Sequence, residues 1–159
     1  MNRVISLALL LFFLVSSAVV VGHPTQGDAA ALMAEAKSLL KKNDFEKALI
    51  VIQKAISTDP RNPAAYVQLA LIHSSMGDDN KARLAVEEAL KIDPNYAAAH
   101  QQRGSQLRRA KDFEGAIRQA KLALSLKPDP EFAAYAHLTL ARTYEELKRY
   151  DEALNEYRE

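Results

Sequence analysis

The chain has 159 residues, of which 48% are hydrophobic, and it carries 21 Lys and Arg against 20 Asp and Glu. This length predicts one domain, and the balanced charge excludes the long-range attraction that nucleic acids exert on basic proteins, so we expect no nucleic-acid partner. Cysteine is absent, which excludes disulfides, thiolate nucleophiles and Cys-based metal sites.

Residues 1–22 have the pattern of an export signal. A basic start with Arg3 is followed by an apolar run from Val4 to Val15, which only Ser6 interrupts, and then by small residues. This order is typical of a secretory signal peptide. An uncleaved membrane anchor is the alternative, because residues 4–21 are barely long enough to span a bilayer. Both interpretations predict an exported protein, periplasmic or extracellular, which residues 4–21 anchor to the inner membrane if they are not cleaved.

The rest of the chain repeats itself at intervals of 34 residues. Prolines and two series of alanines recur at this spacing: Pro60, Pro94 and Pro128; Ala48, Ala82 and Ala116; Ala55, Ala89 and Ala123. The last step is 37 residues and leads from Ala116 to Ala153. Such a period predicts stacked units that are each too small to bury an apolar face alone. We expect repeats at approximately 29–62, 63–96, 97–130 and 134–159.

The second unit predicts two antiparallel helices. Asn62 is placed to cap a helix that begins at Pro63, where a missing N–H costs nothing. One stripe of this helix carries residues at helical spacing, namely Tyr66, Leu69, Ala70 and His73. Gly77 suits the left-handed position after the helix, and a second helix is expected from about Asn80 to Ile92.

These residues resemble the tetratricopeptide repeat. The family's first helix has an aromatic residue, a Leu–small pair and a second aromatic residue, which correspond here to Tyr66, Leu69-Ala70 and His73. The second helix has a small, a large apolar and another small residue and then a closing proline, which correspond to Ala82, Val86, Ala89 and Pro94. The other units fit comparably over Asp28 to Glu159. The resemblance implies an all-α fold for 28–159, a right-handed α-solenoid of antiparallel helix hairpins with three full repeats and a truncated fourth. Three extra residues, Glu131-Phe132-Ala133, predict about one additional turn in the first helix of the fourth unit.

The chain offers little to catalysis or metal binding. His73, His100 and His137 take the places of aromatic residues in the repeat pattern, and no His-x₃-His pair occurs. The serines lack a His–carboxylate arrangement, and there is no Gly-rich phosphate loop. We therefore expect no enzyme activity, no metal and no cofactor.

In this family the first helix of each unit lines an inner groove, and the resemblance implies the same here. The corresponding stripe is found by adding 34 and then 37, and its candidate partner-binding residues are Lys37, Val67, Leu71, Gln101, Ser105, Arg108, Leu138 and Arg142. An apolar half followed by two arginines suits a peptide with an apolar segment and then an acidic group. Alternatively, Arg108 and Arg142 are only solvated, or paired with Glu145 and Glu146.

One subset of the family holds the C-terminal carboxylate of heat-shock chaperones with groove lysines and asparagines. The corresponding places here hold Met33, Lys37, Gln68, Ala98 and Gln102. Because only Lys37 matches, this specialised role is not expected.

The sequence thus predicts an exported scaffold, in a bacterial envelope, that binds a peptide or protein segment in its concave groove. Two alternatives stay open. The first is a self-associating envelope component that forms homo-oligomers through its C-terminal end, where Leu154 and Tyr157 lack a covering helix. The second is a non-catalytic segment of a larger envelope enzyme or synthesis complex.

Overall fold

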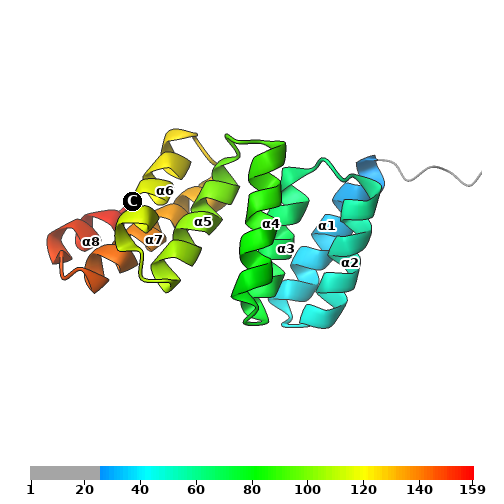
Figure 1. The fold of residues 1–159 in the computed structure, drawn as a ribbon, viewed down its shortest axis with the longest axis horizontal. Coiled ribbons are helices and arrows are strands. Elements are labelled where there is room, and N and C mark those ends of the chain that lie inside the picture. The colour runs from blue at the N-terminus through cyan, green and yellow to red at the C-terminus, as the bar shows by residue number, and fades with distance from the viewer. Residues whose placement is uncertain (1–25) are drawn as a thin grey trace, which may run out of the picture.

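The computed structural model describes residues 26–159, which form eight helices and no strand (Figure 1). The helices are α1 (Gln26–Lys41), α2 (Phe45–Thr58), α3 (Pro63–Ser75), α4 (Asp79–Ile92), α5 (Ala97–Arg109), α6 (Phe113–Ser125), α7 (Pro130–Glu146) and α8 (Tyr150–Glu156). The predicted all-α fold is confirmed. The segment interpreted as a signal peptide or anchor, residues 1–22, lies outside the described residues.

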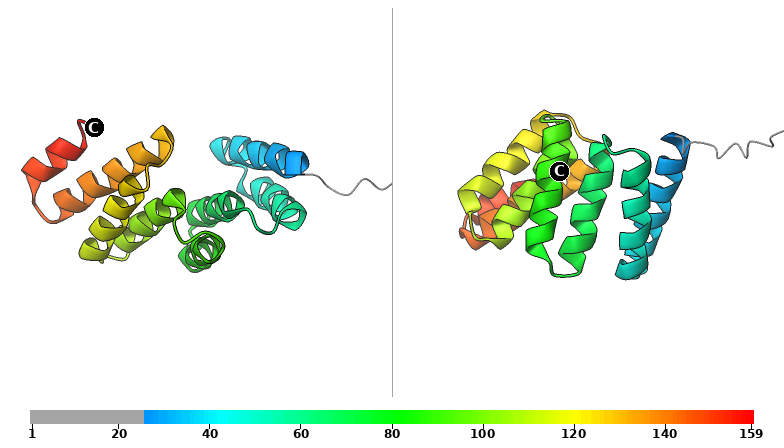
Figure 2. Two further views of the ribbon diagram at one scale, coloured as in Figure 1. Left: turned by 90° about the horizontal axis from the view of Figure 1, so that it is seen from above. Right: turned by 45° about the vertical axis from the view of Figure 1, so that its right-hand side comes forward.

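The helices form four antiparallel pairs that stack into a right-handed solenoid (Figures 1 and 2). In the view from above, the pairs follow an arc, and α1 and α7 lie on the two sides of its hollow (Figure 2). Three pairs are full, and the fourth ends in α8, which has seven residues. The predicted arrangement of three full repeats and a truncated fourth is therefore confirmed.

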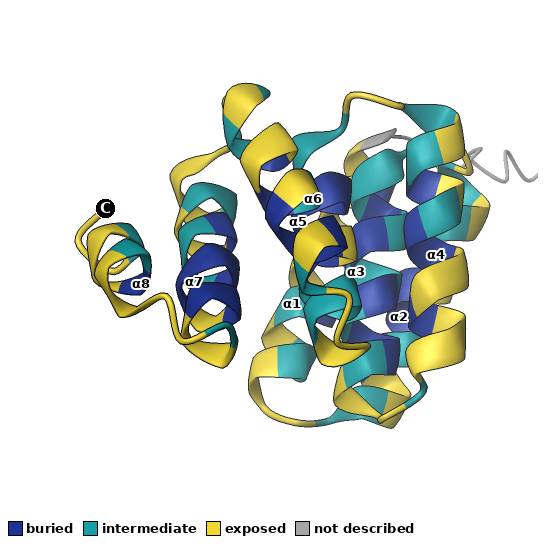
Figure 3. Ribbon diagram, turned by 60° about the vertical axis from the view of Figure 1, so that its left-hand side comes forward, coloured by how far each residue is buried: buried dark blue, intermediate teal, exposed yellow. Residues whose placement is uncertain are grey.

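Small residues form the contact between the two helices of each pair. Two series at the repeat spacing are almost completely buried: Ala48, Ala82, Ala116 and Ala153, and Ala55, Ala89 and Ala123. In the third pair, a Cβ atom on Gly104 would lie 3.2 Å from the carbonyl oxygen of Ala116 and 3.3 Å from the amide nitrogen of Ala120. Both are backbone atoms of α6, so a side chain at Gly104 would push the two helices apart. The buried residues accordingly face inward along α5 and α6, whereas α8 is largely exposed (Figure 3).

The turns between paired helices share one backbone conformation. Gly77 has the predicted left-handed φ of 79°, and three non-glycine residues adopt it at equivalent places: Asn43 (59°), Lys111 (63°) and Lys148 (59°). A side chain in this conformation costs about 1 kcal/mol or more, so the tight packing of the pairs imposes it there. At the start of α3, Asn62 caps the helix as predicted, because its side chain accepts a hydrogen bond from the amide of Ala64 at 3.1 Å.

The inserted residues lengthen α7. It has 17 residues, whereas α3 and α5 have 13 each, which agrees with the predicted extra turn. Phe132 from this turn packs against the cluster of buried residues that includes Val67, Val86 and Ala98. The extra turn is therefore fixed to the cluster that α5 shares with α3 and α4, and this positions the beginning of α7 beside the hollow of the arc.

Candidate functional site

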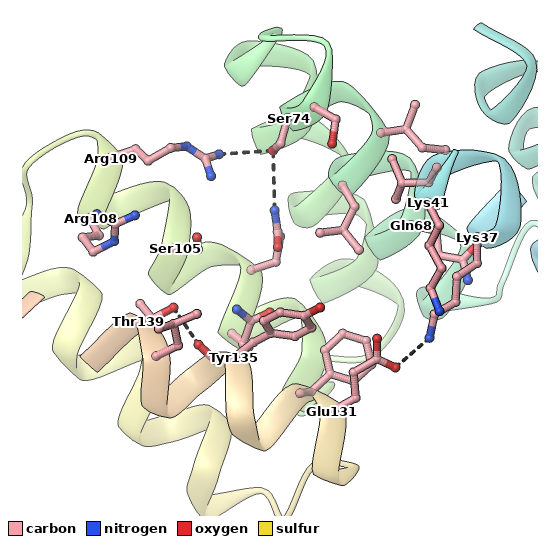
Figure 4. Close-up of a pocket in the computed structure, with 18 of the residues that line it drawn as sticks. Lys37, Lys41, Gln68, Ser74, Ser105, Arg108, Arg109, Glu131, Tyr135 and Thr139 are labelled. Carbon is pink, nitrogen blue, oxygen red and sulfur yellow. Dashed lines mark hydrogen bonds and ion pairs between the residues drawn. The ribbon is translucent and has the colours of Figure 1, made fainter. Parts of the chain in front are cut away.

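A groove of about 550 Å³ lies between the first helices of the four pairs, α1, α3, α5 and α7 (Figure 4). Seven of the eight candidate residues line it: Lys37, Leu71, Gln101, Ser105, Arg108, Leu138 and Arg142. The eighth, Val67, is only 1% exposed and belongs to the core between α3, α4 and α5. Its neighbour Gln68 lines the groove instead, because successive helical side chains point about 100° apart. Val67 is therefore corrected to a core residue.

Amide side chains form part of the groove wall. Gln101 and Gln102 are 5% and 3% exposed. The Nε2 atom of Gln102 donates to the hydroxyl of Ser74 at 3.5 Å, whereas the side chain of Gln101 has no hydrogen-bond partner within residues 26–159. The Oε1 atom of Gln68 is also buried without a partner in that part of the chain. A glutamine amide both donates and accepts, so the unpartnered amide of Gln101 matches the N–H and C=O groups of a peptide backbone.

An ion pair crosses the groove at one end, which we name the lysine end. The Nζ atom of Lys37 on α1 lies 2.6 Å from Oε2 of Glu131 on α7 (Figure 4). Lys41 lines the groove on the same side. The two paired side chains are 44% and 48% exposed, and such pairs typically contribute about 0.2–1 kcal/mol. The pair is therefore weak enough for another charged group to compete with it.

Arginines gather at the opposite end, which we name the arginine end. Arg109 donates to the hydroxyl of Ser74 at 3.1 Å and to Oδ1 of Asp79 at 3.0 Å, which joins α5 to α3 and α4. Arg108 and Arg142 also line the groove, and neither forms an ion pair with a carboxylate of residues 26–159. Glu145 instead accepts a hydrogen bond from the hydroxyl of Tyr157 at 2.9 Å. The expected alternative of Arg142 paired with Glu145 is thus not present.

The groove lining is strongly basic, although the whole chain has a formal net charge of +1. Lys37, Lys41, Arg108, Arg109 and Arg142 face it, and Glu131 is its one carboxylate. Apolar side chains, Leu40, Leu71, Phe132 and Leu138, lie among these charges. The arrangement can bind an acidic chain that carries apolar residues, because positive groups in a hollow attract anions and the apolar groups bury hydrophobic side chains.

Several lining residues were outside the sequence prediction. Tyr135, Glu131 and Phe132 enter from the beginning of α7, before the stripe that counting by 37 identifies at Leu138. The three inserted residues were the available signal, because an added turn must place its side chains somewhere beside the groove. Arg109 could not be predicted as a groove residue, because it is held at the groove by contacts with Ser74 and Asp79 of the second repeat.

The histidines fill structural places. His100 is 9% exposed, and its ring nitrogens lie 2.8 Å from Oε1 of Gln119 and 2.8 Å from the carbonyl oxygen of Pro94. His73 is 8% exposed, and burial, opposed by the charge of Asp78, lowers its pKa below the usual value. His137 lies 2.8 Å from Glu156. Within residues 26–159, no group of three or more His, Asp or Glu side chains is placed to hold a metal ion.

Two tetratricopeptide repeat family models match the chain, one over residues 39–103 and one over residues 134–159. Together they cover more than half of it. Among curated proteins, the chain is similar to the tetratricopeptide repeat and J domain-containing co-chaperone DNJ1 of Cryptococcus neoformans var. grubii. The two are 33% identical over 138 residues, which is 87% of this chain and 26% of the relative. The chain therefore spans about a quarter of the length of this relative.

Solved structures share the fold. TTC0263, a thermophilic TPR protein in Thermus thermophilus, has a TM-score of 0.73 and 27% identity, covering 82% of this chain and 71% of that one. The first TPR of Spaghetti (RPAP3), bound to the HSP90 peptide SRMEEVD, has a TM-score of 0.65 and 20% identity, covering 79% and 98%. At 20% identity, the second likeness shows the fold alone.

The predicted localisation is wrong. It placed the protein outside the cytoplasm, in a bacterial periplasm or extracellular, with residues 4–21 as a candidate inner-membrane anchor. The curated relative is instead a fungal co-chaperone. Among residues 26–159, no helix is long and apolar enough to cross a membrane.

Proposed function

Because this chain belongs to the tetratricopeptide repeat family, we propose that it is a non-catalytic scaffold that binds a segment of a partner protein in the groove of α1, α3, α5 and α7. One observation carries the proposal. Arg108 and Arg142 line the groove without a carboxylate partner among the described residues, and Arg142 makes its side-chain hydrogen bond with the neutral hydroxyl of Tyr157, so both guanidinium groups can pair with a carboxylate of another molecule.

The segment that fits best is extended, with apolar residues followed by acidic ones. Leu71 and Leu138 offer contacts for the apolar part, and Gln101 offers an unpartnered amide for the backbone. The excess of basic groups in the lining favours an acidic occupant. The co-chaperone relative is consistent with a protein partner. We do not extend the proposal to the carboxylate grip of chaperone-binding members, since its single matching residue, Lys37, is paired with Glu131.

The test uses a labelled peptide with two leucines followed by two glutamates, and the same peptide with glutamines in place of the glutamates. We expect the acidic peptide to bind the parent protein at least about tenfold more tightly, because hydrogen bonds to charged groups contribute about 1.5–3 kcal/mol each. The double variant Arg108→Glu with Arg142→Glu should lose this difference. Its unfolding free energy should change by less than about 0.5 kcal/mol, since both changes lie outside the core.

The matched control is Lys54→Glu with Lys121→Glu. It reverses the same charge at two exposed positions of α2 and α6 that do not line the groove. Binding of the acidic peptide to the control should match the parent. Equal losses in both double variants would reduce the effect to general electrostatics and overturn the proposed site.

Self-association is the second candidate function. The exposed side chains of Tyr150, Leu154 and Tyr157 give α8 and its end an apolar surface, with exposed fractions of 66%, 49% and 49%. Such a surface favours contact with another protein or a second copy. Light scattering over a range of protein concentrations distinguishes self-association from a monomeric scaffold. Self-association raises the molecular mass with concentration, whereas a monomeric scaffold keeps the mass constant.

A further inference from the structure

The lysine end of the groove depends on the extra turn of α7. This turn contains Glu131 and Phe132, which come from the three-residue insertion in the fourth unit. Glu131 pairs with Lys37 across 94 residues of sequence, at 2.6 Å. The insertion therefore supplies a carboxylate to the groove from within the chain.

Phe132 holds this carboxylate in position. Its side chain packs against the buried cluster of α3, α4 and α5, and it also lines the groove. Glu131 is thus attached to a helix turn with a fixed apolar contact. A partner that needs Lys37 must replace Glu131 at that nitrogen, whereas a partner at the arginine end meets no such obstacle.

The two ends consequently differ in available positive charge. At the lysine end, Glu131 neutralises Lys37 and leaves Lys41. At the arginine end, Asp79 neutralises Arg109 and leaves both Arg108 and Arg142. Glu131 and Arg142 are eleven positions apart on α7, which corresponds to about 16 Å along the helix and about five residues of an extended peptide.

We propose that Glu131 is an internal competitor that sets the polarity of the groove. It directs the acidic group of a bound segment to Arg108 and Arg142 and denies a second acidic group access to Lys37. The groove therefore favours a segment with apolar residues and acidic groups at the arginine end, and it gains no affinity from a second acidic group at the lysine end. This inference rests on the proposed function, because it concerns the occupant of the same groove.

The experiment compares two labelled peptides on the full chain. The one-ended peptide has leucines followed by glutamates, and the two-ended peptide has a further glutamate about five residues before them. The parent protein should bind both with similar affinity. Glu131→Gln, which keeps the size of the side chain, should tighten the two-ended peptide by about two- to fivefold, the equivalent of an exposed ion pair, and the one-ended peptide by less than twofold.

Two controls locate the effect. Lys37→Gln added to Glu131→Gln should abolish the gain, because the second acidic group then meets only Lys41 at that end, as it does in the parent protein. Glu146→Gln removes the same charge from an exposed position of α7 outside the groove lining and should leave both peptides unchanged. Circular dichroism of each variant verifies that the helices are intact.

The outcomes separate the two proposals. If the one-ended peptide fails to bind the parent protein, the proposed function fails and this inference with it. If it binds normally but Glu131→Gln gives no gain for the two-ended peptide, or an equal gain for both, the inference alone is overturned.

Discussion

Helix α5 has thirteen residues, and its two sides differ in which residues they carry: one side faces α6 and the other faces the groove. Toward α6 stands Gly104, at a position where the two backbones approach closely. Toward the groove stand Gln101, Ser105 and Arg108. The first side repeats in every unit, because each helix pair needs the same close contact.

The groove side does not repeat. At one equivalent register the four first helices carry Lys37, Leu71, Ser105 and Arg142, a cation, an apolar group, a hydroxyl and another cation. The contact between paired helices at equivalent places is alanine each time, as in Ala48, Ala82, Ala116 and Ala153. The repeat therefore specifies the scaffold, whereas the departures from the repeat specify the occupant of the groove.

The sharpest test of this comparison uses two adjacent residues of α5. Gly104→Leu should lower the unfolding free energy by about 1–3 kcal/mol or more, because its side chain would collide with backbone atoms of α6 at 3.2 and 3.3 Å. Ser105→Leu inserts the same side chain into the half-exposed groove wall and should change stability by less than about 0.5 kcal/mol. Urea unfolding measures both. Similar losses in the two variants would show that the two sides of α5 are not packed differently.

A smaller effect is expected where a side chain fixes the beginning of a groove-lining helix. Asn62→Ala removes the hydrogen bond to the Ala64 amide and should cost about 1 kcal/mol. Asp129 stands at the same place before α7, but its side chain makes no capping hydrogen bond. Asp129→Ala should therefore cost clearly less in the same urea unfolding assay. An equal cost would contradict the assignment of the Asn62 effect to its capping hydrogen bond, because Asp129 lacks that bond.

The contact between paired helices could be predicted from the sequence because its cause is local. Helical spacing, a proline and a pair of alanines are enough to identify it, and Asn62, Gly77 and the longer α7 were predicted for the same reason. The left-handed residues Asn43 and Lys111 were not predicted, because asparagine carries a weaker signal for this conformation than glycine and lysine carries none. Their conformation follows from the packing of the pair and not from the residue itself.

The groove could be predicted only in part. Counting by the repeat length identified most of its wall, but it also selected Val67, which the packing of α3 against α5 turns into the core. The pair of Lys37 with Glu131 could not be predicted, because it depends on the curvature that brings the first and fourth helix pairs face to face. Curvature is the accumulated result of every contact between neighbouring pairs, so no single unit of sequence contains it.

The smallest expected effect concerns the polar residue His73, which is buried on the core side of α3. Burial lowers its pKa in the folded protein, and although Asp78 opposes this shift and Lys81 adds to it, the net direction is down. Below its ordinary pKa of about 6.5, the unfolded chain therefore binds a proton that the folded protein resists. The contribution of neutral His73 is present above that pH and is lost as the pH falls from it toward the folded-state pKa.

His73→Phe places an aromatic ring at this position, as the repeat pattern does elsewhere, and removes the titration. We expect the loss of unfolding free energy between pH 7.5 and pH 5.0 to be smaller in the variant than in the parent protein, because a ring without a proton site cannot favour the unfolded chain in acid. Urea unfolding at the two pH values measures this difference. The contributions of the carboxylates to the pH dependence are the same in both proteins and therefore cancel in the comparison. Parallel pH profiles would show that the ring of His73 is hydrated in the folded protein and that the core side of α3 is less dry than its exposure suggests.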